Sequence, residues 1–302
     1  MTDTYHIPVM LKECIEGLNI KPNGIYVDLT FGGGGHSREI LKKMTNGHLY
    51  AFDQDKDAVI NAEKFDSESF TLIEGNFRYL KRYLKAYGIT KVDGILGDLG
   101  ISSHQIDEGS RGFSTRFDAE LDMRMDQSAD LTAKNVVNGY SQDELQRILG
   151  MYGEVRNAKT LAMAIVAERI NKEIVTVEDL KAILNRFAKR GRENRYYAQV
   201  FQAIRIEVNQ ELKALEEVLE QSAEILNKGG RLVIMSYHSL EDRPVKNFIA
   251  TGKIIGGVEK DFYGNVLKPL VAVNRKPIEA SEEERAINNR ARSAKLRVAE
   301  KI

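Results

Sequence analysis

The chain has 302 residues, 42% of them hydrophobic and 29% charged, which is the composition of a globular protein rather than a disordered or fibrous one. Lys+Arg and Asp+Glu both number 44. This zero net charge argues against a protein that coats nucleic acid through bulk charge, although local basic patches remain open. The single cysteine, Cys14, excludes an internal disulfide framework and a Cys-rich zinc site.

The sequence predicts neither a membrane-spanning segment nor a signal peptide. No apolar run approaches the roughly 18 residues needed to span a bilayer. Residues 1–18 carry acidic side chains and lack the apolar block of a signal peptide. We therefore expect a cytoplasmic protein with no membrane partner.

The first hundred residues alternate short β-like runs with helical segments. Strands are predicted at residues 25–28, 49–53, 70–73 and 92–98, and helices at about 37–44 and 57–64. Strands separated by helical segments are typical of βαβ units, which build a parallel sheet.

The alternation stops after the fourth strand. Residues 110–197 show helical periodicity and no convincing strand. Ser141 and Thr176 each precede an acidic residue by three positions, the pattern of a capping box, and residues 158–170 are apolar at helical spacing. We expect this segment to form a helical domain inserted into the sheet domain.

The βα pattern then resumes. It predicts a long helix at 201–226, a stop at 227–230, a fifth strand at 231–236, and a terminal hairpin formed by 253–255 and 267–273. The predicted architecture is α/β. Residues 1–109 and 198–302 form one doubly wound sheet domain, and residues 110–197 form the helical insert.

A glycine-rich loop joins the first strand to the first helix after it. Residues 28–36 read DLTFGGGGH, and successive glycines let the backbone approach a ligand closely. Asp53 ends the second strand, where a carboxylate meets the ribose hydroxyls of a bound nucleoside. These features predict a nucleoside-cofactor site; a structural glycine turn without a ligand is the alternative.

Two cofactors compete for this loop. The dinucleotide pattern G-x-G-x-x-G fails because Ser37 stands where its third glycine should be, which disfavours a dehydrogenase. What remains is Asp28 followed by Gly32 and Gly34. This spacing suits S-adenosylmethionine, whose charged amino-acid end needs polar partners rather than a diphosphate cradle.

Eight short motifs follow one another along almost the whole chain: HIPVM at 6–10, GGGGHS at 32–37, DLGISSHQ at 98–105, RGFS at 111–114, DMRMD at 122–126, FQAIRI at 201–206, SYHSLEDR at 236–243 and RARSAKLR at 290–297. Each motif alone is weakly specific. In this order they resemble the bacterial 16S ribosomal RNA (cytosine-N4) methyltransferase family.

The resemblance implies a class I methyltransferase fold with an inserted helical domain and S-adenosylmethionine as methyl donor. It implies N4-methylation of a cytidine in the decoding region of 16S rRNA, with the small ribosomal subunit as partner and no metal. A homodimer is compatible with the sequence, which does not fix the oligomeric state. The family's cofactor positions correspond here to Gly34, Gly35, His36, Asp53, Phe77, Asp98 and Gln105.

The reaction itself points to residues at strand ends. Asp98 ends the fourth strand and could accept a hydrogen bond from the cytosine amine, or it could bind only the cofactor. His238 follows the fifth strand as a base contact or proton acceptor, with a structural role as the alternative. Tyr237 could stack on a flipped base or pack in the core. No cysteine lies near these strand ends, so we expect an amine target and not ring carbon 5.

Two basic clusters are candidate phosphate contacts: residues 189–195 at the end of the insert, and Arg290, Arg292, Lys295 and Arg297 near the C-terminus. Solvated surface charge is the alternative for both. The insert and the basic tail disfavour a small-molecule or protein methyltransferase, because a small substrate requires neither. A non-catalytic RNA-binding assembly factor that uses S-adenosylmethionine as a ligand remains the competing function.

Overall fold

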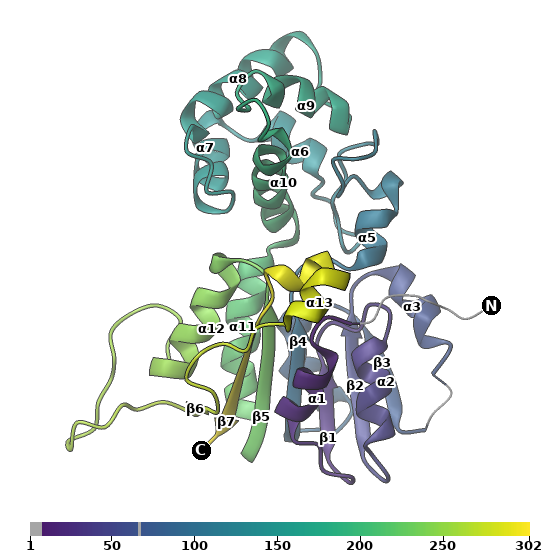
Figure 1. The fold of residues 1–302 in the computed structure, drawn as a ribbon, viewed down its shortest axis with the longest axis vertical. Helices are drawn as coiled ribbons and strands as arrows, with labels where there is room; N and C mark the ends of the chain where they lie inside the picture. The colour runs from purple at the N-terminus through teal and green to yellow at the C-terminus, as the bar shows by residue number, and fades with distance from the viewer. Residues whose placement is uncertain (1–7, 66–67) are drawn as a thin grey trace. The chain divides into compact units, whose positions relative to one another are not determined.

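The structure is a computed structural model that describes residues 8–65 and 68–302, so His6 and Ile7 of the first motif lie outside the described residues. The chain divides into two compact units (Figure 1). One comprises the described residues up to Gly100 together with Leu212–Ile302, and the other comprises Ile101–Glu211. None of the helices in this described part has both the length and the apolar content of a membrane span.

A seven-stranded sheet in the order β3-β2-β1-β4-β5-β7-β6 forms the core of the first unit. The strands are β1 Ile25–Asp28, β2 His48–Asp53, β3 Phe70–Glu74, β4 Val92–Asp98, β5 Leu226–Ser236, β6 Leu270–Ala272 and β7 Lys295–Lys301. Strands β1 to β5 pair in parallel, whereas β7 runs antiparallel to both β5 and β6. The expected doubly wound α/β fold is confirmed.

Helices cover both faces of this sheet, because successive strand residues point to opposite sides. Val27 and Ile95 pack in one core with α4, α11 and α12, while Tyr26 and Leu96 pack in a second core with α1 and α2. The helices of this unit are α1 Leu11–Leu18, α2 Gly35–Lys42, α3 Lys56–Ala62, η1 Phe77–Tyr79, α4 Leu80–Ala86, α11 Glu211–Ile225, α12 Ser239–Thr251, α13 Glu282–Ile287 and η3 Asn289–Arg292.

The second unit is helical. Its elements are α5 Ser103–Asp107, η2 Gly109–Arg111, α6 Ala133–Gly139, α7 Gln142–Met151, α8 Ala158–Asn171, α9 Val177–Asn185 and α10 Glu193–Asn209. The predicted capping boxes at Ser141 and Thr176 are both present. The unit extends beyond the expected limits of 110 and 197, because α10 continues through residue 197 and contributes Val200 and Phe201 to the same helical core.

Two of the recognised motifs interlock inside this helical unit. The buried guanidinium of Arg111 donates to the backbone carbonyl of Arg124 at 2.8 Å, and the Met123 N–H donates back to the Arg111 carbonyl at 3.0 Å. Arg124 forms a two-pronged ion pair with Asp122, with N–O distances of 2.9 and 2.7 Å. These motif residues therefore have a packing role in the unit.

The predicted long helix at 201–226 is wrong: the chain forms two helices, α10 and α11, separated by Gln210 in the left-handed region at φ 50°. Contacts within the second unit hold the end of α10. The Asn209 side chain donates to the Met123 carbonyl at 2.8 Å and accepts the Met125 N–H at 2.7 Å. No glycine or proline marks this break, so local propensity could not reveal it.

The predicted terminal hairpin is also wrong. Residues 253–255 form no strand, and β6 pairs with β7, which was not predicted. β7 carries a period-2 pattern in which Leu296 and Val298 point into the core. The charged residues Lys295 and Arg297, which alternate with them, concealed that pattern.

Arg297, assigned to a basic surface cluster from the sequence, is instead a structural residue of β7. Its guanidinium donates to both carboxylate oxygens of Asp242 on α12, at 2.6 and 2.9 Å. Both side chains are only 13% exposed. This ion pair connects the antiparallel edge of the sheet to the helix that follows β5.

We predict that Arg297→Ala lowers the free energy of unfolding by about 2 kcal/mol or more, because it leaves the Asp242 carboxylate half-buried and unpaired. Lys295→Ala on the same strand removes an exposed cation and should change stability by less than about 0.5 kcal/mol. Urea denaturation measures both. Equal stability of the two variants would show that Arg297 does not hold this edge.

Candidate active site

Three carboxylates end three neighbouring parallel strands. Asp28 ends β1, Asp53 ends β2 and Asp98 ends β4, and β1 lies between the other two strands in the sheet. The carboxyl ends of parallel strands meet at one edge, which is where doubly wound sheets bind ligands. The structure thus places Asp53 and Asp98, both predicted from the sequence, at the same edge.

Asp28 holds the glycine loop in place. Its Oδ2 accepts a hydrogen bond from the Ser37 hydroxyl at 2.7 Å, and its Oδ1 accepts the Thr30 N–H at 3.0 Å. The carboxyl is buried, and this burial raises its pKa. Ser37, which breaks the dinucleotide pattern, therefore serves to bind Asp28 and ties the start of α2 to the end of β1.

The four glycines of the loop have two different roles. Gly32 has φ 52°, and a side chain added there or at Gly33 would point into open space. A side chain at Gly34 would clash with the Phe65 ring at 2.5 Å, and one at Gly35 with Pro8 at 2.2 Å. The first two glycines thus border a space that a ligand can enter, while close packing requires the last two.

Asp53 connects the second strand to this loop. Its Oδ2 accepts the Gly32 N–H at 2.8 Å and its Oδ1 accepts the Asp55 N–H at 2.9 Å. Burial raises the pKa of Asp53 to about 6. Each carboxylate oxygen has a second lone pair, so Asp53 can still accept hydrogen bonds from a ligand.

Phe77 follows β3 in the short helix η1. It packs partly buried against the core that contains Phe52. Next to it, the Asn76 side chain donates to Gln54 at 2.9 Å, which connects η1 to the segment after β2. The structure supports the core-packing interpretation of Phe77, and its contact with adenine stays a prediction.

Asp98 is held from two sides. The Tyr237 hydroxyl donates to Asp98 Oδ1 at 2.7 Å, and the Asp98 N–H donates to Thr30 Oγ1 at 2.7 Å. Burial, with a smaller effect from the charges of Asp28 and Glu241, raises the pKa of Asp98 to about 6, although the Tyr237 hydrogen bond lowers it. Asp98 is therefore mostly ionised at neutral pH, with a carboxylate fixed toward the strand ends.

Tyr237 and Glu241 are site residues whose roles the sequence did not reveal. Burial and the Asp98 charge raise the Tyr237 pKa, so its hydroxyl keeps its proton and acts as a donor. The buried Glu241 accepts the Tyr237 N–H through Oε2 at 2.9 Å. Its Oε1 lies 3.1 Å from His238 Nε2. Glu241 thus fixes the turn that carries both Tyr237 and His238.

His36 lies at the start of α2 and is buried. The Val9 carbonyl accepts a hydrogen bond from the ring, and burial lowers the His36 pKa, so the imidazole is neutral. Its Nε2 has no hydrogen-bond partner among the described residues. A buried polar atom of this kind is costly unless a ligand or water satisfies it.

Gln105 belongs to the second unit. Its side-chain oxygen accepts the Ser102 N–H at 3.0 Å, and its own N–H donates to Ser102 Oγ at 3.1 Å. This capping box at the start of α5 gives Gln105 a local structural role. Its predicted contact with the cofactor stays a prediction.

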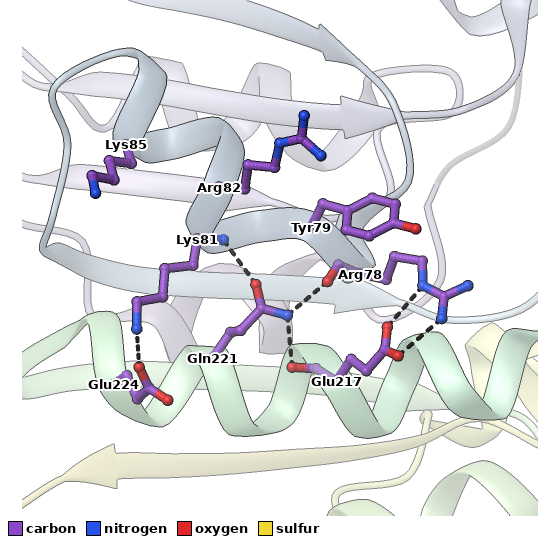
Figure 2. Close-up of a pocket in the computed structure, with 8 residues that line it drawn as sticks. All are labelled: Arg78, Tyr79, Lys81, Arg82, Lys85, Glu217, Gln221 and Glu224. Carbon is purple, nitrogen blue, oxygen red and sulfur yellow. Dashed lines mark hydrogen bonds and ion pairs between the residues drawn. The ribbon is translucent and has the colours of Figure 1, made fainter.

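A groove of about 540 Å³ lies between η1, α4 and α11, and Figure 2 shows the residues that line it. Arg78 makes a two-pronged ion pair with Glu217, and Lys81 pairs with Glu224. Gln221 bridges the Lys81 N–H and the Arg78 carbonyl. These pairs neutralise much of the positive charge, so the groove is a weaker candidate site than the strand ends.

We predict that Asp98→Asn stabilises the cofactor-free protein more at pH 8 than at pH 5. The folded-state pKa of about 6 exceeds the ordinary value of 3.8, so ionising Asp98 opposes folding. That cost begins as pH rises above about 4, grows as pH approaches 6 and reaches at most about 3 kcal/mol. Asn keeps an oxygen for the Tyr237 hydroxyl but carries no charge.

Urea denaturation of parent and variant at both pH values measures this. We expect the stability difference to widen by about 1 kcal/mol between pH 5 and pH 8. A difference that does not change with pH would show that Asp98 is not a buried, charged group.

Several known proteins are similar to this chain over most of its length. A ribosomal RNA small subunit methyltransferase H from Cytophaga hutchinsonii is 63% identical over 98% of this chain and 99% of its own length. A protein of the same name from Christiangramia forsetii is 57% identical over 99% of this chain and 98% of its own length. Among solved structures, an rRNA methylase from Streptococcus thermophilus aligns over 97% of this chain and 93% of its own, at 14% identity and a TM-score of 0.42. The MraW methylase family model matches residues 3–302, and the chain belongs to that family.

Proposed function

We propose that this protein transfers the methyl group of S-adenosylmethionine to the exocyclic N4 amine of a cytidine in small-subunit ribosomal RNA. The observation that carries the proposal is the pairing of a nucleoside-binding loop with a fixed carboxylate acceptor, Asp98, at one edge of the sheet. Relatives named as small-subunit rRNA methyltransferases support the choice of substrate.

The residues at this edge fit S-adenosylmethionine. Gly32 and Gly33 border the open space, and Asp53 would accept the two ribose hydroxyls. The unpartnered Nε2 of His36 would receive a hydrogen bond from a polar group at the amino-acid end of the cofactor. Gly34 and Gly35 allow α2 to begin close to that end, and Phe77 would lie over the adenine.

The bound cofactor supplies a methyl group on a positively charged sulfur, which is already activated for transfer. The chain must therefore orient the nucleophile. The cytosine amine is a weak nucleophile because its lone pair is delocalised into the ring. An acceptor for one of its N–H bonds favours the pyramidal form and stabilises the positive charge that develops.

Asp98 provides that acceptor. Tyr237 holds Oδ1, which leaves Oδ2 to accept an N–H of the amine. With a pKa of about 6, the carboxylate is ionised at neutral pH and can take the proton that the methylated nitrogen releases. His238, whose Nε2 lies 3.1 Å from Glu241 Oε1, is the second group that could contact the base or receive this proton.

The helical unit would hold the RNA. Lys189, Arg190, Arg192 and Arg195 are all exposed, and no hydrogen bond or ion pair engages their side chains within the described ranges. Unpaired surface cations of this kind are suited to phosphate contacts, which fix the position of a folded RNA without reading its bases. Because the chain is neutral overall, such local clusters have to supply the attraction.

We predict that Asp53→Ala weakens S-adenosylmethionine binding at least tenfold. The variant loses the hydrogen bonds to the ribose hydroxyls, and hydrogen bonds to charged groups contribute about 1.5–3 kcal/mol each. Glu63→Ala, an exposed acid just after α3, is the matched control and should bind as the parent does. Titration calorimetry measures the affinity, and parent-like binding by Asp53→Ala would remove the ribose contact from the proposal.

We predict that Cys14→Ala retains nearly full turnover, whereas Asp98→Ala loses about a hundredfold or more. Cys14 is buried in α1, and burial raises its pKa well above the usual value, so it does not form the thiolate that attack on ring carbon 6 requires. Methyl incorporation into RNA at saturating cofactor measures both variants. A covalent protein–RNA adduct that disappears in Cys14→Ala would contradict the amine mechanism.

A further inference from the structure

Residues 253–268, between α12 and β6, form an arm that extends away from both elements (Figure 1). Its two sides pair at an antiparallel bridge between Lys260 and Val266, and the Leu267 N–H donates to the Glu259 carbonyl at 2.8 Å. The arm is therefore a hairpin with its own backbone hydrogen bonds. Neither the cofactor site nor the acceptor site uses it.

Asp261 builds the turn at the tip of the arm. Its Oδ1 accepts the N–H groups of Tyr263 and Asn265, at 2.9 and 2.8 Å, and its Oδ2 accepts the Asn265 side chain at 3.0 Å. All of these bonds lie within the turn. These bonds occupy both oxygens of the carboxylate, so Asp261 stabilises the turn and does not act as a free surface acid.

This turn displays two aromatic rings. Phe262 is 98% exposed and Tyr263 is 85% exposed, with ring centroids 5.6 Å apart and planes at 88°. Side chains of this size lose much stabilisation when they remain in water. Large exposed apolar groups on an ordered turn indicate a surface that another molecule covers.

The base of the arm is anchored to its unit. Ile254 packs against the core that contains Val245 and Phe248, and the Asn247 side chain donates to the Ile254 carbonyl at 3.2 Å. Gly252, at φ 74°, lies so close to Pro269 and Leu267 that an added Cβ would stand 3.0 Å from the proline ring. The tip is thus presented from a fixed root.

Charge identifies the kind of molecule that covers the tip. Within the arm, Lys253, Lys260 and Lys268 outnumber the two acids, Glu259 and Asp261. Lys260 stands beside the tip, and the nearby acid Glu259 is paired with Lys253. A basic segment that carries exposed aromatic rings is complementary to single-stranded nucleic acid, whose phosphates attract cations and whose bases stack on rings.

We propose that the tip of this arm binds an unpaired segment of RNA, with Phe262 or Tyr263 stacked on a base and Lys260 and Lys268 near phosphates. The proposal rests on the proposed RNA substrate and adds a contact outside the reaction site. The polar side chains of the tip, Asp261 and Asn265, disfavour a membrane as the occupant, since an inserted tip would leave them in hydrocarbon.

The test compares the parent with Phe262→Ala/Tyr263→Ala in binding radiolabelled 16S rRNA, free and within small ribosomal subunits. Loss of one base–aromatic stack should weaken RNA binding about tenfold or more. Affinity for S-adenosylmethionine should stay that of the parent. Ile287→Ala, which truncates a similarly exposed residue on α13, is the matched control and should bind RNA as the parent does.

A second pair of variants separates stacking from apolar contact. Phe262→Trp/Tyr263→Phe keeps two aromatic faces and should bind RNA within about twofold of the parent. Phe262→Leu/Tyr263→Leu keeps apolar area without rings and should resemble the alanine variant. If the leucine variant binds RNA like the parent, base stacking is wrong.

Parent-like RNA affinity of the alanine variant would overturn the proposal. If the alanine variant binds RNA like the parent but no longer self-associates in sedimentation, a second copy of the chain is the occupant. If it binds RNA like the parent but no longer binds anionic lipid vesicles, a membrane is the occupant. Direct RNA binding is measured without methyl transfer. If the parent protein binds RNA through the tip but transfers no methyl group, that result contradicts the proposed function and still supports the role of the arm.

Discussion

The site depends on the hydrogen bonds that hold three carboxylates at one edge of a parallel sheet. Asp28, Asp53 and Asp98 end adjacent strands, and burial raises the pKa of each. Donors from the loops offset this cost: the Ser37 hydroxyl for Asp28, the Gly32 N–H for Asp53 and the Tyr237 hydroxyl for Asp98. The same bonds fix the glycine loop and the turn after β5.

The three carboxylates have separate tasks because their surroundings differ. Both oxygens of Asp28 accept bonds from the loop it supports, so Asp28 acts on structure. Asp53 accepts two backbone N–H groups and retains lone pairs toward the open space beside Gly32 and Gly33. Asp98 is held at one oxygen by Tyr237, in a turn that Glu241 fixes, which suits it to orient a weakly nucleophilic amine.

Local patterns predicted much of this arrangement. The alternation of strands and helices predicted the bounds of β1 to β4 within one residue at each end. Because Asp53 and Asp98 end their strands, the sequence also predicted that both lie at the edge of the sheet where the site is. Contacts between distant segments could not be predicted in this way. The Tyr237–Asp98 bond joins the turn after β5 to the end of β4, and the Gln210 break depends on bonds from Asn209 to residues 123 and 125. β7 was missed because Lys295 and Arg297, which flank Leu296, resembled a surface cluster, although Arg297 is paired with Asp242.

The central claim is that Asp98 orients the exocyclic amine of a cytidine in small-subunit RNA. The most direct test incubates small ribosomal subunits with the protein and methyl-labelled S-adenosylmethionine, digests the RNA to nucleosides and identifies the labelled one by mass spectrometry. The account predicts label in N4-methylcytidine, with little or none when Asp98→Ala replaces the parent. Label in 5-methylcytidine, or subunits that remain unlabelled by the parent protein, would contradict it.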